Sequence, residues 1–203
     1  MDWQSILYAI PGILLGLTVH EYCHALCALK LGDSTARDQG RITLNPLKHI
    51  NIVGFLFIIF AGFGWAKPVQ FNPENLSHPR RDKALIAAVG PLSNMVLGIL
   101  FILTVKALLF FFGPDVIDTP LFWVLFQVAA INFGLFVFNM LPIPPLDGSH
   151  IAFSSLNLRA ETENRIMRIG TPLLFIIMII QNNTDITIIP IGKWVRAIIM
   201  FIL

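Results

Sequence analysis

Long apolar runs separated by short polar segments make up most of the chain. The hydrocarbon core of a bilayer is about 30 Å thick and requires roughly 20 helical residues to cross it. Runs 84–112 and 121–141 meet that requirement, and the first run is predicted to form a helix from Trp3 to about Lys30. Three more apolar runs occupy 50–64, 166–180 and 186–203. We therefore predict an all-α polytopic membrane protein with about five transmembrane helices.

Two of these runs depart from the pattern of a spanning helix. The run 50–64 would be about 22 Å long as a helix, which is short for a span, and it contains three glycines. We expect a re-entrant or interfacial element there, and the sequence leaves open which of the two it is. The run 186–203 is interrupted by Pro190, Lys193 and Arg196. It is therefore expected either to cross the membrane or to lie in its interface.

The composition supports the same class of protein. Apolar residues make up 56% of the 203 residues and charged residues only 13%, whereas a soluble domain usually carries about a quarter charged residues. The formal net charge of +2 gives no reason to expect nucleic acid as a partner. Two cysteines cannot build a disulfide scaffold. We expect one membrane-embedded domain over 1–203.

The sequence His20-Glu-Tyr-Cys-His24 places ionisable groups inside the first apolar run. Residues i and i+4 share one face of a helix, so both imidazoles can bind one divalent ion while Glu21 acts as a general base on water. Each ionisable group inside a membrane costs roughly 2.5–3.5 kcal/mol on insertion scales. A cation bound by the histidines would offset that cost. The alternative interpretation is a polar helix end.

A catalytic zinc site normally has three protein ligands, so the histidine pair requires a distant partner. Prolines between 142 and 145 end the apolar run that precedes Asp147. An aspartate before a glycine is also common in turns and at helix caps. Taken together with the histidine pair, however, Asp147 is the predicted third ligand. Cys27, seven residues after His20, is disfavoured as a ligand because Asp147 already completes the set.

These motifs resemble those of the site-2 proteases, a family of intramembrane zinc metalloproteases. The family carries H-E-x-x-H in one membrane helix and N-x-x-P-x-P-x-L-D-G in a later one, which correspond here to His20–His24 and Asn139–Gly148. The segments Gly64–Val69 and Gly90–Asn94 are similar to stretches between those motifs. No PDZ or CBS domain is inserted within this region.

The resemblance implies a zinc-dependent intramembrane endopeptidase that hydrolyses peptide bonds in or near transmembrane segments. The catalytic core is then expected over about 5–158, followed by C-terminal helices over about 164–203. The resemblance also implies the following roles at a site with one Zn²⁺ per chain: His20, His24 and Asp147 as metal ligands, Glu21 as the base that activates water, and Asn139 as a contact to the substrate backbone or the oxyanion.

Metal binding also constrains the topology, because all three ligands must lie about 2 Å from one ion. His24 and Asp147 both lie toward the C-terminal ends of their apolar helices, so these ends must face the same side of the membrane. Runs 84–112 and 121–141 provide two crossings between them, and the run 50–64 must then enter and leave on one side. Eleven of the 14 basic residues share that face. The positive-inside rule places it in the cytoplasm and the N-terminus outside.

Asn94 and Asn132 are further polar residues in apolar helices. Asn94 has two readings that the sequence does not separate: an amide that joins neighbouring helices, or a residue of the site. For Asn132 we expect only the first role.

The expected partners are the lipid bilayer and a membrane-protein substrate with a transmembrane helix. A regulatory partner or a homo-oligomer stays open, and no nucleic acid is expected. The expected location is the plasma membrane of a prokaryote, with the mouth of the active site facing the cytoplasm.

Two other functions are compatible with the pattern: a non-catalytic protein that binds transmembrane segments, and a small transporter of metal ions or protons. The intact Glu21 disfavours the first, and the lack of an inverted repeat disfavours the second.

Overall fold

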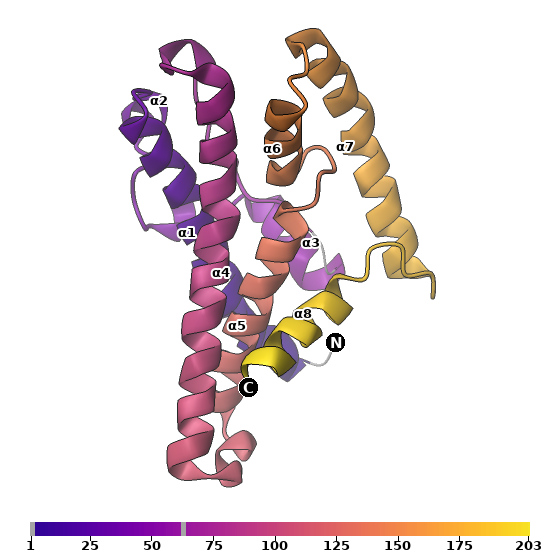
Figure 1. Cartoon of the computed structure of the whole chain (residues 1–203). Helices are drawn as coiled ribbons and strands as arrows, with labels where there is room; N and C mark the ends of the chain where they lie inside the picture. Colours follow the sequence, from indigo (N-terminus) through magenta and orange to yellow (C-terminus); the bar gives the residue numbers. More distant parts are fainter. Residues whose placement is uncertain (1–2, 62–63) are drawn as a thin grey trace.

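The computed structural model describes residues 3–61 and 64–203, and its regular structure is helical (Figure 1). The helices of the described residues are α1 Trp3–Lys30, α2 Thr35–Asp38, α3 Ile52–Ala61, α4 Pro79–Phe112, α5 Pro120–Asn139, α6 Asp147–Ser155, α7 Ala160–Asn183 and α8 Ile191–Ile202. Short 3₁₀ turns at Pro46–Lys48, Pro73–Asn75 and Pro114–Asp118 lie in the connections.

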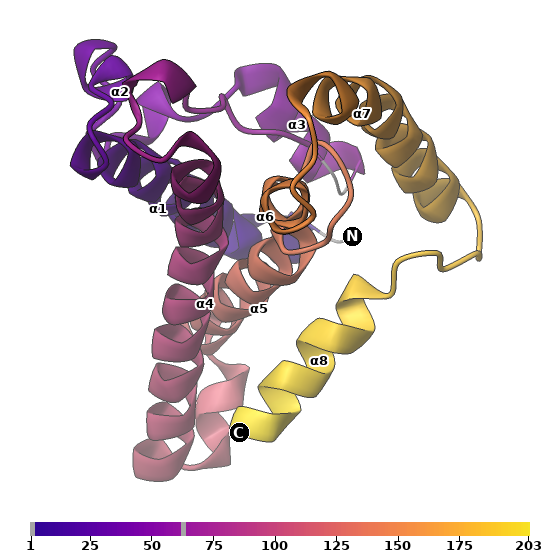
Figure 2. The same cartoon turned by 45° about the horizontal axis from the view of Figure 1, so that its top comes forward.

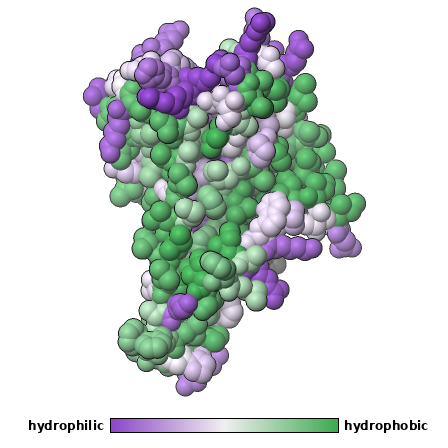
Figure 3. Space-filling view, in the orientation of Figure 1, coloured by the Kyte–Doolittle hydropathy of each residue, from purple (hydrophilic) through white to green (hydrophobic). Residues whose placement is uncertain are grey.

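Helices α1, α4, α5 and α7 are long and apolar enough to cross a membrane. This confirms the all-α polytopic class, with four such helices in the described residues where about five were expected. The difference lies in 186–203, where α8 has only 12 residues and is thus about 18 Å long. In Figure 3 the flanks are largely apolar, and polar residues gather at the end that carries α2, the start of α4 and the turn between α6 and α7.

Helices α1, α4 and α5 form the body that carries the site. Figures 1 and 2 show α5 running beside α4 and α1 crossing them. The chain reverses between α4 and α5, where Pro120 begins α5 and Thr119 caps it by accepting a hydrogen bond from Phe122 N at 3.3 Å. The contact between these helices and α8 is built on buried apolar side chains: Ile102, Val105, Phe122, Ala129, Phe133 and Ile199. The reversal returns α6 to the end of the molecule where α1 finishes.

The segment that contains α3 projects from the α1, α4 and α5 bundle, and its two ends lie next to each other. Ile50 and Ala66 form an antiparallel bridge across its base, and Lys67 N donates to His49 O at 2.7 Å. The two ends of the predicted re-entrant or interfacial element are therefore adjacent, as expected for an element that enters and leaves on one side. Of that element, residues 62–63 lie outside the described part of the chain.

Asp33 ties the end of α1 to the segment that follows α3. This fully buried carboxylate accepts hydrogen bonds from Thr35 N and Oγ1 at 3.2 and 2.6 Å, from Asn72 N at 2.9 Å and from Asn75 Nδ2 at 2.7 Å. Burial alone would raise the pKa of Asp33, but these hydrogen bonds outweigh it and hold the pKa below its ordinary value. Asp33 thereby fixes the loop that runs past the site.

Replacing Asp33 with asparagine is expected to lower the free energy of unfolding by about 2 kcal/mol, because the amide turns a donor toward N–H groups. In the wild type, this stabilisation is complete above about pH 3.9, the ordinary pKa of an aspartate. It is lost as the pH falls through the lower pKa of the folded state. Thermal unfolding in detergent near neutral pH and in acid measures both effects.

The matched control is Asp38→Asn, which breaks an exposed pair between Asp38 and Arg37. Such surface pairs contribute little to stability. If both variants lost the same stability near neutral pH, Asp33 would not have the anchoring role described above.

Candidate metal centre

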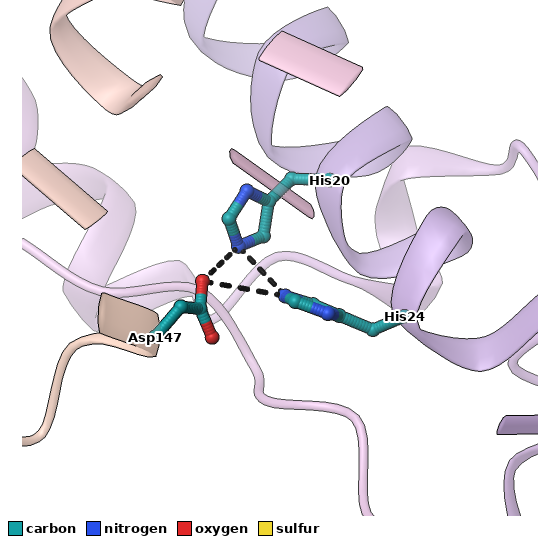
Figure 4. Close-up of side chains that lie close together, drawn as sticks. All are labelled: His20, His24 and Asp147. Carbon is teal, nitrogen blue, oxygen red and sulfur yellow. Dashed lines mark hydrogen bonds and ion pairs between the residues drawn. The ribbon is translucent and has the colours of Figure 1, made fainter. Parts of the chain in front are cut away.

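Two histidines of α1 and the first residue of α6 converge inside the molecule (Figure 4). His20 and His24 are one helical turn apart and both are buried. Their Nε2 atoms lie 2.9 Å apart, and Asp147 Oδ2 lies 3.1 Å from His20 Nε2 and 3.5 Å from His24 Nε2. One ligand atom from each residue lies within 4.8 Å of the others. The structure thus brings the three predicted ligands together, in a group that could hold a metal ion.

Asp147 reaches the histidines because α6 begins directly against the end of α5. The helix α5 finishes at Asn139, and the prolines that follow prevent its continuation. Gly148 permits the close approach of the two helix ends, since a Cβ at that position would overlap the carbonyl oxygens of Met140 and Leu141. The requirement for glycine beside the aspartate is therefore steric.

Hydrogen bonds on the far side of each ring determine which nitrogen faces the centre. His20 Nδ1 lies 2.7 Å from Asn94 Oδ1, and His24 Nδ1 lies 2.6 Å from Ile86 O. Both partners are oxygen acceptors, so both Nδ1 atoms carry the hydrogen. In the neutral rings each Nε2 then presents a lone pair to the centre.

Asp147 Oδ2 is buried and accepts no hydrogen bond from the described residues. Two imidazole lone pairs and a carboxylate oxygen thus face one another at distances of 3.5 Å or less. Such a set of acceptors is unfavourable in an apolar environment without a cation between them. Nitrogen and carboxylate ligands in this number match those of a catalytic zinc site, so the residues fit the metal.

Glu21 is buried beside this centre and is bound by the backbone of a distant segment. Its Oε2 accepts a hydrogen bond from Val69 N at 2.8 Å. The segment that carries Val69 is itself held by Arg41, which donates from Nη2 to Lys67 O at 2.5 Å. The carboxylate of Glu21 is therefore oriented by the chain that returns from α3.

A cavity of about 800 Å³ opens beside His20, Glu21 and Asp147. Its walls are mostly apolar and include Ile13 and Leu17 of α1, Ile131 and Leu135 of α5, Leu174 and Phe175 of α7, and Trp65 after α3. The rings of Trp65 and Phe175 meet edge to face, with centroids 6.0 Å apart. Residues of α3 and of the chain that follows it therefore line the cavity beside the centre, among them Ile58, Ile59 and Trp65.

Asn139 lines the same cavity but is not linked to the predicted ligands. Its Nδ2 donates to Leu135 O at 3.0 Å, within its own helix. Its contact to a substrate stays a prediction. Cys27 packs with Ala28 and Leu76 in a small apolar cluster, which agrees with the apolar role preferred for it.

Two residues of α4 contribute to the centre, and sequence reasoning missed the role of the first, Gly90. Gly90 lies against the rings, and a Cβ there would overlap His24 Nε2 and come within 2.8 Å of His20 Cε1. Asn94, for which the sequence left two roles open, bonds directly to His20 and also joins α4 to α1 and α5 through Gly16 O and Asn132 Oδ1. The family-like segment Gly90–Asn94 was the available signal, but nothing in it indicated which atoms would meet.

Comparisons with known proteins point to one family. The family model "Peptidase family M50" matches residues 115–180. The "Putative zinc metalloprotease YwhC" of Bacillus subtilis is 40% identical over 148 residues, which are 71% of this chain and 67% of that protein. Proteins with the same designation are MJ0611 of Methanocaldococcus jannaschii, 32% identical over 72% of this chain and 71% of its own length, and Rip2 of Mycolicibacterium smegmatis, 31% identical over 70% of this chain. The chain spans about half of that Rip2 protein. No solved structure matches.

Proposed function

The chain belongs to peptidase family M50, the site-2 protease family of zinc metalloproteases, and on that premise we propose that it is an intramembrane endopeptidase. It would hydrolyse peptide bonds in or next to transmembrane segments of other membrane proteins. The observation that carries the proposal is the buried set of three acceptors, His20 Nε2, His24 Nε2 and Asp147 Oδ2, inside an apolar helical body. These residues would hold one Zn²⁺ per chain.

The residues around the centre suit peptide hydrolysis. Zinc would supply a Lewis acid that polarises the scissile carbonyl and makes water more acidic. Glu21 would take the proton from the attacking water and pass it to the leaving amine. Its bond to Val69 N holds the carboxylate in one orientation beside the centre. The apolar walls of the cavity limit the access of bulk water to the reacting groups.

The cavity fits a substrate that comes from the membrane. It follows α1 from Ser5 to His24, about 28 Å of helix, and is lined chiefly by aliphatic side chains. A substrate helix has its carbonyls hydrogen-bonded internally, so it must unwind locally before Glu21 and the metal can act on one of them. We infer that the occupant is a transmembrane segment with a locally weak helix.

Charge distribution supports a cytoplasmic position for the mouth of the site. The end of the molecule where α1 finishes and α4 begins carries many basic residues: Lys30, Arg37, Arg41, Lys48, Lys67, Arg80, Arg81 and Lys83. The opposite turn, 113–119, carries Asp115 and Asp118 and no basic residue. By the positive-inside rule this distribution supports an N-terminus outside, and we propose the plasma membrane of a prokaryote as the location.

Removal of zinc is expected to abolish cleavage, because the metal would be the group that polarises the scissile carbonyl and makes water more acidic. The full chain, reconstituted in lipid vesicles, is given a panel of synthetic peptides with one apolar helix of about 20 residues that contains or lacks a central Asn-Gly pair. Products are identified by mass spectrometry before chelation, after chelation and after Zn²⁺ is restored. Cleavage of the Asn-Gly peptides that follows the zinc content is the expected result.

Metal content measured on the same preparation separates the alternatives. One tightly held zinc per chain together with cleavage supports the proposal. Several zinc ions per chain without cleavage would indicate a transporter, and no bound zinc would indicate a non-catalytic binding protein. Cleavage that persists after complete removal of the metal would refute the proposed mechanism.

A further inference from the structure

One face of α4 lies directly behind the two histidines. Its contacts come from Ile86, Gly90 and Asn94, which are spaced four residues apart and therefore share a face of the helix. The carbonyl oxygen of Ile86 accepts a hydrogen bond from His24, and the side-chain oxygen of Asn94 accepts one from His20. Gly90, which has no side chain, leaves room for both rings. The hydrogen-bond acceptor behind His24 is thus a backbone carbonyl, whereas the acceptor behind His20 is a side-chain amide.

The amide of Asn94 is fully buried and its orientation is fixed by its own donors. Its Nδ2 donates to Gly16 O of α1 at 3.0 Å and to Asn132 Oδ1 of α5 at 2.9 Å. With both hydrogens of the amide used there, Oδ1 must face His20 Nδ1, at 2.7 Å. The reverse orientation would place the NH₂ group against the N–H of the ring.

Asn132 extends this chain of hydrogen bonds into α5. It is also fully buried, and its Nδ2 donates to Val128 O of its own helix at 2.8 Å. That bond turns its Oδ1 toward Asn94. His20 therefore donates a hydrogen bond to Asn94, Asn94 donates one to Asn132, and Asn132 donates one to the α5 backbone.

We propose that Asn94 is a positioning residue for the metal centre, held in orientation by Asn132. It fixes the hydrogen of His20 on Nδ1 and the plane of the ring, so that the Nε2 lone pair points at the metal. The inference rests on the proposed function, in which His20 is a zinc ligand. Partners of this kind around a zinc-binding histidine typically change metal affinity 10–100-fold when removed.

The same contacts could instead serve only to join α1, α4 and α5, since buried amides often connect membrane helices. The two roles depend on different atoms of Asn94. Joining the helices requires the Nδ2 donors to Gly16 O and Asn132 Oδ1, whereas positioning His20 requires an acceptor oxygen beside its Nδ1, which a carboxylate presents whichever way it is turned. Substitution by aspartate removes the donors and keeps the acceptor, so it separates the two roles.

The test compares Asn94→Asp and Asn94→Leu in the full chain in detergent. Zinc affinity is measured by competition with a chromophoric chelator, and thermal unfolding is measured without metal. We expect Asn94→Leu to weaken zinc binding by about 10–100-fold and Asn94→Asp to retain zinc affinity near the wild-type value, although both lower the unfolding temperature. Ser93→Ala, which alters a neighbouring hydroxyl bonded to Gly90 O, is the control and should bind zinc normally.

Equal loss of zinc affinity in the aspartate and leucine variants would overturn the proposal, as would normal zinc affinity in Asn94→Leu. If either variant fails to fold, Asn132→Leu provides a second test, because it leaves the contact between Asn94 and His20 in place but removes the partner that orients it. Weaker zinc binding and an altered absorption spectrum of the cobalt(II)-substituted protein are expected there; an unchanged affinity and spectrum would contradict the proposal. A wild-type chain that binds no zinc would instead refute the proposed function itself.

Discussion

Replacing Glu21 with glutamine is expected to leave zinc bound while lowering the rate of peptide hydrolysis by about 10²–10⁴-fold, the usual contribution of a general acid–base residue. Glutamine has nearly the same shape and can still accept the hydrogen bond from Val69 N through its amide oxygen. It cannot take a proton from water. Because the three proposed ligands are unchanged, the loss should fall on turnover and not on metal content.

The measurement pairs zinc content with cleavage of a transmembrane peptide in vesicles. Glu74→Gln is a matched control, because Glu74 is exposed in the short turn Pro73–Asn75 and lies outside the cavity. A Glu21→Gln protein that cleaves at the wild-type rate would exclude Glu21 as the base. One that has lost its zinc would show that the carboxylate supports the metal site instead of the proton transfer.

Replacing Gly90 with alanine is expected to weaken zinc binding by more than about 100-fold, beyond the usual effect of removing a hydrogen-bond partner of a ligand. The added methyl group would overlap His24 Nε2 and lie 2.5 Å from His24 Cε1 and 2.8 Å from His20 Cε1. The imidazoles cannot move aside easily, because each is tied through Nδ1 to α4 itself. One small substitution should therefore displace two ligands together.

Zinc titration of the purified variant measures this effect, and thermal unfolding in detergent shows whether the rest of the fold persists. Gly192→Ala is a suitable control, since a Cβ at Gly192 of α8 meets no atom within 4 Å. Wild-type zinc affinity in Gly90→Ala would mean that the rings do not lie as close to α4 as the structure shows.

The local features of the site could be predicted from the sequence, because they depend on spacing within one element. The pair His20 and His24 required only the helical repeat, and Asp147 followed from the proline-rich break before it together with the need for a third ligand. The return of 50–64 to its starting side followed from counting the crossings that separate His24 from Asp147. The bridge between Ile50 and Ala66 shows how the backbone achieves it.

The contacts behind the ligands could not be predicted, because they depend on the rotation of one helix relative to another. Asn94 and Asn132 are 38 residues apart and meet only through the packing of α4 against α5. Nothing in the sequence showed that Val69 N would meet Glu21, since that contact depends on the path of an irregular segment. The length of α8 was also uncertain, because apolar composition alone does not show where a helix begins.

The separation of His24 and Asp147 along the chain has a consequence for biosynthesis. More than 120 residues, including both α4 and α5, must be translated between them. At about 5–20 residues per second, this interval lasts roughly 6–25 s. During that time the emerging polypeptide holds only the histidine half of its centre. On the proposed ligand set, α4 and α5 are therefore synthesised before the centre can be completed, and peptide hydrolysis cannot begin before that point, although α7 is still to follow.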